Sequence, residues 1–202
     1  HVSEALQGAI ENFELLNTHI QPCLDRALHE LSPVEFAILL LGAYELLYHP
    51  EIPVAIHLDH GKNFDIVERA MEIGFGSVMY DGSRKDYADN LKLTKKIVAL
   101  AHDKGIAVQA ELGNVPYIGE MQMETVEWER YMTDPDQAVQ FVSETGIDTL
   151  AVAIGNAHGF FRERSIPDYD RLSTIASLVD IPLVLHGASD WQNDRVTEVI
   201  KR

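Results

Sequence analysis

Three short apolar segments of this chain each lead into a histidine that is followed by glycine, and this recurrence strongly constrains the fold. The three pairs are His60-Gly61, His158-Gly159 and His186-Gly187. Short apolar runs that are partly β-branched and bounded by proline or glycine are typical of buried strands. In parallel α/β folds, ligand sites are built at the carboxyl ends of strands. The pattern therefore predicts that the three histidines meet at one edge of a parallel sheet and bind one divalent metal.

Strand and helix patterns alternate from residue 53 to the end of the chain. Five strands are expected, at residues 53–58, 76–81, 106–112, 148–154 and 182–186. The helices that separate and follow them are expected at residues 64–73, 86–103, 134–146, 168–179 and 193–202. Alternation of this kind indicates an α/β fold with a parallel sheet and right-handed crossovers.

Residues 1–52 show helical patterns throughout. Apolar residues at helical spacing predict a helix over 3–21, and a short apolar stripe continues beyond it. A serine followed by Pro33 marks the start of a further helix, which is expected to end near Tyr48. This last helix is apolar on nearly all sides, so we expect it to be buried. The chain is therefore divided into a helical segment, 1–52, and an α/β segment, 53–202.

Charge and composition limit the partners and the location that we expect. The formal net charge is −16, which disfavours binding to the phosphate backbone of a nucleic acid. The one modest basic stretch, 92–96, falls on an expected helix, where a solvated face is the simplest interpretation. No apolar run approaches the roughly 20 residues that cross a membrane, and the start lacks the basic region of a secretory signal. With a single cysteine, Cys23, these features favour the cytoplasm.

Five motifs carry a resemblance to a known family. They are residues 53–61 (PVAIHLDHG), 79–83 (MYDGS), 110–113 (AELG), 150–159 (LAVAIGNAHG) and 182–189 (PLVLHGAS). In order and spacing they resemble the class II, zinc-dependent aldolases of the fructose- or tagatose-bisphosphate type. The resemblance implies a partial TIM barrel, similar to the third to seventh of the family's eight strands. It also implies reversible aldol cleavage of a ketose 1,6-bisphosphate to dihydroxyacetone phosphate and glyceraldehyde 3-phosphate, with activity impaired by the missing strands.

A second resemblance covers the helical segment. Residues 31–35 (LSPVE) and 41–53 (LGAYELLYHPEIP) resemble the C-terminal helical part of the antitermination factor NusB. Together the two resemblances imply a chimera of two incomplete domains. They leave two alternatives to the aldolase: an RNA-binding or transcription module, and an inactive chimeric fragment. The acidity of the segment argues against RNA, because Arg26 is its one lysine or arginine.

The three histidines suit zinc. Zinc prefers imidazole nitrogens, and catalytic zinc sites commonly have three protein ligands and one open position. We therefore expect His60, His158 and His186 to be the ligands, and the resemblance implies the same set. A lone histidine would more often be a satisfied core or loop residue. Asp81 and Glu111 also end strands and could bind a second cation or orient the histidines; the alternatives are helix capping for Asp81 and a buried polar contact for Glu111.

Two carboxylates are candidates for proton transfer. The resemblance implies that Asp59 exchanges the proton of a substrate hydroxyl, and that Glu120 exchanges the proton of a substrate carbon. For Asp59, the alternative is a solvated loop carboxylate or one that orients a metal ligand. His57, on the same expected strand, is given a packing or supporting role.

The loops after the histidine strands are candidates for phosphate binding. The backbone N–H groups of Gly159 and Gly187 and the hydroxyl of Ser189 could hold a phosphate and a monovalent cation. The alternative is that the glycines serve ordinary turns. The expected partner is a small sugar phosphate. A homo-oligomer is also expected, because an open five-stranded sheet exposes its edges.

Overall fold

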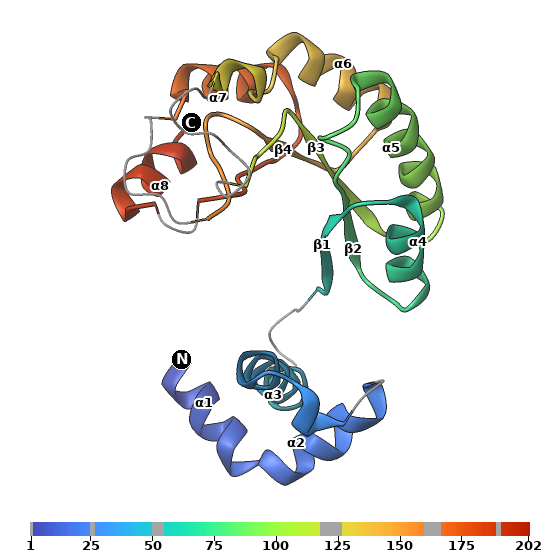
Figure 1. Ribbon diagram of the computed structural model, residues 1–202, viewed down its shortest axis with the longest axis vertical. Helices are drawn as coiled ribbons and strands as arrows, with labels where there is room; N and C mark the ends of the chain where they lie inside the picture. Colours follow the sequence, from blue (N-terminus) through green and yellow to red (C-terminus); the bar gives the residue numbers. More distant parts are fainter. Residues whose placement is uncertain (1, 25–26, 50–54, 118–126, 160–166, 189–190) are drawn as a thin grey trace. The chain divides into compact units, whose positions relative to one another are not determined.

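The chain forms two compact units, His1–Val54 and Ala55–Arg202 (Figure 1). The computed structural model describes residues 2–24, 27–49, 55–117, 127–159, 167–188 and 191–202. None of the helices in these ranges is long and apolar enough to span a membrane.

The first unit is built from helices. They are α1 (Val2–Glu11), α2 (Phe13–Ile20) and α3 (Pro33–Tyr48), with 3₁₀ turns at Gln21–Cys23 and Leu28–Glu30. The prediction of one helix over 3–21 is wrong at Asn12, where α1 and α2 meet. The Asn12 side chain donates a hydrogen bond to the Gly8 carbonyl at 2.9 Å. Side-chain bonds of this kind compete with the helix ladder and bend it.

Helix α3 is less buried than its composition predicts. Leu39, Leu40 and Tyr44 pack against a small core that includes Leu16 and is supplied by α1 and α2. The opposite side is open: Val34 and Ile38 are 68% and 64% exposed. The prediction of a buried helix is therefore wrong on this side. Among the described residues, α1 and α2 cover only one side of α3.

The second unit is an α/β fold with one parallel sheet, as predicted. Its strands are β1 (His57–Gly61), β2 (Ser77–Tyr80), β3 (Ala107–Leu112), β4 (Thr149–Val152) and β5 (Leu183–Val184). Its helices are α4 (Phe64–Glu72), α5 (Tyr87–His102), α6 (Pro135–Thr145), α7 (Tyr169–Leu178) and α8 (Asn193–Ile200), with a 3₁₀ turn at Trp128–Arg130. The strands lie in sequence order, so that β1 and β5 form the two edges. Figure 1 shows α4 to α7 in an arc along one face of the sheet.

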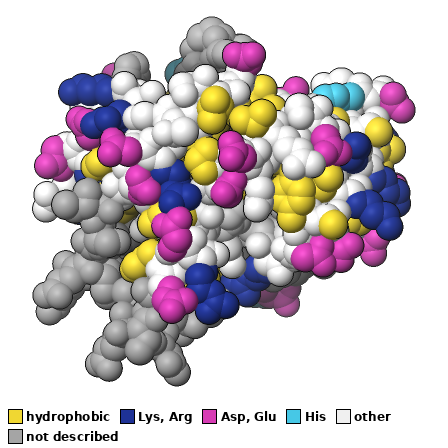
Figure 2. All heavy atoms as spheres, turned by 90° about the horizontal axis from the view of Figure 1, so that it is seen from above, with side chains coloured by type: hydrophobic (Ala, Val, Ile, Leu, Met, Phe, Trp, Pro, Cys, Tyr) yellow, Lys and Arg dark blue, Asp and Glu magenta, His cyan; other side chains and the backbone are white. Residues whose placement is uncertain are grey.

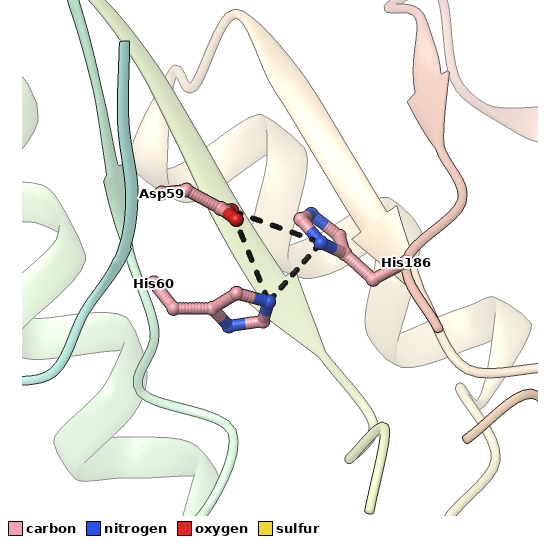
Figure 3. Close-up of side chains that lie close together, drawn as sticks. All are labelled: Asp59, His60 and His186. Atoms are coloured by element: carbon pink, nitrogen blue, oxygen red, sulfur yellow. Dashed lines mark hydrogen bonds and ion pairs between the residues drawn. The ribbon is translucent and has the colours of Figure 1, made fainter. Parts of the chain in front are cut away.

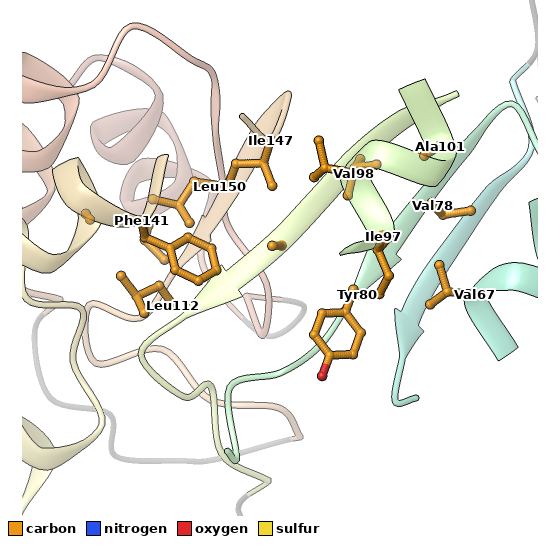
Figure 4. Close-up of a cluster of buried hydrophobic side chains, with 14 of the residues drawn as sticks. Val67, Val78, Tyr80, Ile97, Val98, Ala101, Leu112, Phe141, Ile147 and Leu150 are labelled. Atoms are coloured by element: carbon orange, nitrogen blue, oxygen red, sulfur yellow. The ribbon is translucent and has the colours of Figure 1, made fainter. Parts of the chain in front are cut away.

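The core lies between the sheet and these helices (Figure 4). Val78 pairs with Val108 in register, and both are fully buried on the helix side of the sheet. Ile97 and Phe141 reach the same core from α5 and α6. Successive strand residues point to opposite faces, so Gln109, next to Val108, points away from the helices. This alternation separates the packing face from the face that carries polar groups.

Asparagine or aspartate caps each of the helices α4 to α7, which fixes where the loops after the strands end. The side chains of Asn63, Asp86, Asp134 and Asp168 each accept a hydrogen bond from a backbone N–H in the first turn. Such caps satisfy donors that have no partner inside the helix. Helix α6 ends at Gly146, which adopts the left-handed conformation typical of helix ends.

On the face drawn in Figure 2, acidic and basic side chains are interleaved.

Each of the five strands differs from its predicted bounds at one or both ends, and the two edge strands show why. The first strand is expected at 53–58 but runs from His57 to Gly61, and residues 53–54 lie outside the described ranges. Pairing begins here because the Ile56 carbonyl accepts from the N–H of Gly76 at 3.0 Å, which aligns the strand with β2. The last strand is shorter than 182–186, because His186 has left the ladder and its carbonyl accepts from Asn156 at 2.9 Å.

Candidate active site

Side chains from every strand, or from the loop that follows it, meet at the carboxyl edge of the sheet. They are Asp59 and His60 on β1, Asp81 after β2, Gln109 and Glu111 on β3, His158 after β4, and His186 after β5. The structure therefore brings the three predicted histidines to one edge. In β/α folds this edge is where catalytic residues gather.

His60 has a backbone conformation that aims two neighbouring side chains at the same place. Its φ of +51° is the single positive value among described residues other than glycine, and β1 loses its regular register between Leu58 and Gly61. In a regular strand, Asp59 and His60 would point to opposite faces. Instead, Asp59 Oδ1 lies 3.9 Å from His60 Nε2 and 3.8 Å from His186 Nδ1 (Figure 3).

The spacing of the His60 and His186 imidazoles suits a shared metal ion. His60 Nε2 lies 3.1 Å from His186 Nδ1. Metal–nitrogen bonds of roughly 2.0–2.1 Å in a tetrahedral site place two ligand nitrogens about 3.3 Å apart and their ring centroids about 5 Å apart. The centroid of His60 lies 4.5 Å from that of His186 and 5.0 Å from that of His158. The residues therefore fit a metal ion with imidazole ligands.

His158 lies farther from His186 than His60 does. The ligand atoms of Asp59, His60 and His186 all lie within 4.8 Å of one another, and His158 does not belong to that group. Its ring centroid is 6.2 Å from that of His186. The loop after β3 holds His158 in place: its ring stacks on Tyr117 with centroids 4.6 Å apart, and its N–H donates to the Pro116 carbonyl at 2.8 Å.

Asp81 orients His60. Its Oδ2 lies 2.9 Å from His60 Nδ1, and its Oδ1 accepts from the Ser83 hydroxyl at 2.6 Å. Burial by itself would raise the pKa of Asp81, but the hydrogen bonds from His60 and Ser83 outweigh it and hold this pKa at about 2. The bond to Asp81 in turn raises the pKa of His60. Helix capping, the alternative considered for Asp81, falls to Asp86 instead.

Glu111 is the most deeply buried carboxyl group at this edge. It is 1% exposed, Oε1 accepts from the Val115 N–H at 3.0 Å, and Oε2 lies 3.9 Å from His60 Nδ1. Burial raises the pKa of Glu111 to about 7, and repulsion from Asp81 adds to the effect. Together with His60 and Asp81 it forms a second group whose ligand atoms lie within 4.8 Å of one another.

Two amides that the sequence analysis missed hold His186. Gln109 Nε2 lies 2.6 Å from His186 Nε2, and Asn156 Nδ2 donates to the His186 carbonyl at 2.9 Å. Burial lowers the pKa of His186 to about 4, with a further contribution from His60, so the ring is neutral as a metal ligand requires. The signal for Gln109 was its position two residues before Glu111, because such residues share a face of a strand.

The remaining predicted residues vary in how far the structure describes them. Glu120 and Ser189 lie outside the described residues. Gly159 and Gly187 have φ values of +105° and +64°, and a Cβ at Gly187 would lie 2.7 Å from the carbonyl group of Ala157. Both positions favour glycine, and close approach requires it at Gly187. His57 is exposed, with Nδ1 2.8 Å from the Ser77 hydroxyl.

Histidines and carboxylates at the carboxyl edge of a parallel β/α sheet are typical of metal-dependent β/α-barrel enzymes. The family model described as fructose-bisphosphate aldolase class-II matches residues 6–202. The chain therefore belongs to the class II fructose-bisphosphate aldolase family, whose members are in general metal-dependent.

Curated relatives support this assignment. Fructose-bisphosphate aldolase of Giardia intestinalis is 45% identical over 196 residues, which is 95% of this chain and 59% of the relative. The enzyme of Helicobacter pylori is 46% identical over 143 residues, which is 70% of this chain and 46% of the relative. The chain thus spans about half the length of the curated relatives it matches.

Solved structures agree with the fold. The YdjI aldolase of Escherichia coli K12 matches with a TM-score of 0.66 and 32% identity, over 98% of this chain and 68% of that chain. A putative fructose-1,6-bisphosphate aldolase from Coccidioides immitis has the same TM-score and identity, over 81% of this chain and 61% of that one.

The family match includes most of the helical segment, from residue 6 onward. No finding supports the resemblance of residues 1–52 to NusB, or a chimeric origin of the chain. The aldolase resemblance of residues 53–202 is confirmed, and the match extends beyond the segment that its motifs cover.

Proposed function

We propose that this site carries out the reversible aldol cleavage of a ketose 1,6-bisphosphate, of fructose or tagatose, to dihydroxyacetone phosphate and glyceraldehyde 3-phosphate. The observation that carries the proposal is the convergence of Asp59, His60 and His186 at the carboxyl edge of the sheet, in a chain of this family.

The metal that we assign to the site is zinc. Its ligands are His60 through Nε2, His186 through Nδ1, and His158. The contact of 3.1 Å between His60 Nε2 and His186 Nδ1 supports the first two atoms. When bound, the ion supplies Lewis-acid polarisation of the ketose carbonyl and hydroxyl oxygens. Asp81 lies at the other ring nitrogen of His60, as is common for ligand histidines. The Gln109 amide lies at the other ring nitrogen of His186, where its oxygen can accept from the Nε2–H of a ring that binds metal through Nδ1.

Asp59 is the proton acceptor in this proposal. Its carboxylate is 64% exposed and lies within 4 Å of the ring nitrogens of both His60 and His186, so it faces a substrate held there. Asp59 takes the proton of the C4 hydroxyl while the C3–C4 bond breaks and its electron pair stays on C3. Glu120 then gives a proton to C3.

The phosphate contacts proposed for this reaction are Gly159, Gly187 and Ser189, with a monovalent cation beside them. Support comes from the backbone: Gly187 can approach Ala157 closely because it has no side chain. A backbone without a Cβ leaves room for N–H groups to approach an oxyanion.

Zinc content and cleavage together test the function. The chain, reloaded with zinc after chelation, should hold about one ion and cleave fructose or tagatose bisphosphate slowly, because it spans about half the length of its curated relatives. The His60→Ala, His186→Ala double variant should lose both properties. His102→Ala is the control, because His102 pairs with Asp148 away from the site. Unchanged zinc content in the double variant would refute the ligand assignment.

The role of Asp59 needs a separate readout. Asp59→Ala should leave zinc bound but lower turnover by roughly 10²–10⁴-fold, the usual contribution of a positioned general acid or base. The comparison is best made in this chain and in a full-length family member that carries residues 53–202 of this sequence. Near-full turnover of Asp59→Ala would show that the carboxylate orients a ligand and transfers no proton.

A further inference from the structure

We propose that Lys62, Arg84 and Lys85 form an anion site that binds the phosphate at one end of the substrate. The inference rests on the proposed aldolase function, because it identifies how this chain recognises part of that substrate. None of the three residues was singled out by the motifs of the sequence.

A pocket brings the three cations together. It has a volume of about 200 Å³ and lies between the loop after β1, which supplies Lys62, and the loop after β2, which supplies Arg84 and Lys85. His60 and His158 line the same pocket, so it adjoins the proposed metal ligands. A ligand that reaches the imidazoles therefore also reaches the cations.

The pocket is lined by more basic than acidic side chains, whereas the chain as a whole is acidic. The sequence has 16 lysines and arginines against 32 acidic residues, yet three of these cations line one small pocket. Among the described residues that line it, Asp81 is the one carboxylate, and hydrogen bonds to His60 and Ser83 already occupy it. Lys62 and Lys85 form no ion pair with a described residue. The pocket is thus equipped to receive an anion.

The size and chemistry of the pocket favour a phosphate group. Its volume far exceeds the roughly 10–15 Å³ that one water needs, but lies below the roughly 300–1,000 Å³ of pockets that enclose a drug-sized ligand. One end of a sugar phosphate therefore fits better than a whole bisphosphate. An arginine supplies paired donors for phosphate oxygens, and lysines supply compact point charges.

This anion site is distinct from the glycine loops. Neither Gly159 nor Gly187 lines the pocket, and the two glycines follow β4 and β5 whereas the cations follow β1 and β2. A ketose 1,6-bisphosphate carries phosphates at both ends of the sugar. Two separate anion sites match that substrate class.

Binding of inorganic phosphate to the chelator-treated chain tests the site without metal. Calorimetric titration should detect binding that weakens as salt increases. Lys62→Gln and Lys85→Gln should each reduce the affinity by roughly two- to fivefold, and their combination by more. Arg84→Gln is a further variant. The matched control is Lys104→Gln, an exposed lysine outside the pocket. Thermal unfolding verifies that each variant folds. If Arg84→Gln does not fold, the variants of the two exposed lysines test the site without it.

A second measurement separates this proposal from the proposed function. In the zinc-loaded chain, the lysine variants should raise KM for fructose bisphosphate and leave zinc content unchanged. Phosphate binding that the pocket variants do not weaken, that Lys104→Gln weakens equally, or that is absent in the native chain would overturn the anion site. Failure to bind zinc or to cleave substrate, with phosphate binding as predicted, would overturn the aldolase function and leave the anion site standing.

Discussion

A single residue, His60, sets the geometry of the site. Its left-handed backbone costs on the order of 1–3 kcal/mol, and such strain persists only where the surroundings enforce it. Here the enforcement is visible. A Cβ at Gly61 would lie 2.6 Å from the Met79 carbonyl, so the chain passes β2 closely just after His60, and Asp81 holds the ring. As a result Asp59 and His60 both face His186.

At the same scale, we predict that Gln109 is a positioning residue for His186. Gln109→Leu should weaken zinc binding by about 10–100-fold, because the ring loses the partner of its Nε2 atom. Gln109→Glu supplies a carboxylate acceptor for the Nε2–H of a ring that binds metal through Nδ1, and should restore most of the affinity. Competition with a chelator measures the effect, and Gln140→Leu on the exposed side of α6 is the control. Equal affinity of Gln109→Leu and the native chain would contradict this role.

The buried carboxyl group of Glu111 should make metal-free stability depend on pH. Its pKa is about 7 in the folded chain against 4.5 when unfolded, so the folded chain keeps a proton that the unfolded chain loses. This contribution, roughly 3 kcal/mol, is present below pH 4.5 and is lost as the pH rises through about 7. Urea unfolding of the chelator-treated chain at pH 5 and pH 8 should show it, and Glu111→Gln should remove it. If the native chain and Glu111→Gln lost the same stability between pH 5 and pH 8, Glu111 would be excluded as the cause.

At the scale of elements, the caps and the sheet explain how the site is assembled. The strands bring their carboxyl ends to one edge, and the capped starts of α4 to α7 limit the loops that follow. These features follow local rules: alternation of patterns, Asx caps and glycine ends. They could therefore be predicted from the sequence, together with the meeting of His60, His158 and His186.

Other features depend on contacts between distant residues and could not be predicted in that way. A strand of period two places Asp59 and His60 on opposite faces, so the bulge that unites them is invisible to the pattern. The partnership of Gln109 with His186 joins β3 to the loop after β5. The exposure of Ile38 depends on how many helices pack around α3, which composition alone does not specify.

The cap of α6 offers a prediction about an element. Asp134 Oδ1 accepts from the Gln137 N–H at 2.9 Å, so Asp134→Ala should lower the free energy of unfolding by about 1 kcal/mol. Asp136→Ala removes a charge from the same first turn but no cap bond, and should cost less. Chemical denaturation of both variants makes the comparison. An equal loss would mean that charge, and not the cap, stabilises this helix start.

At the scale of the molecule, the second unit is an open sheet. Its edge strands β1 and β5 present backbone groups that can pair with another chain. An apolar cavity of about 670 Å³ lies between α7, β5 and α8, lined by Leu172, Leu183 and Val199 among others. In the first unit, considered separately, apolar side chains on α3 such as Val34 and Ile38 are exposed.

We therefore predict that the chain associates with itself. Sedimentation should show species larger than the monomer at micromolar concentrations. Pairing of the edge strands and burial of apolar surface would stabilise such assemblies. Ile38→Lys should reduce this association if the apolar side of α3 contributes to it, and the exposed Lys104→Gln serves as control. A compact monomer at all concentrations, which unfolds cooperatively and binds no dye for apolar surface, would contradict the prediction.

The most direct test of the central claim is to locate the metal. Crystals of the chain grown with zinc should give one anomalous difference peak at the zinc edge. We predict that it lies within bonding distance of His60 Nε2, His186 Nδ1 and His158, with Asp59 beside it but not bound. The structure also contains the alternative group of His60, Asp81 and Glu111. A sole peak in that group, or at Asp59, His60 and His186 without His158, would contradict the proposed catalytic site.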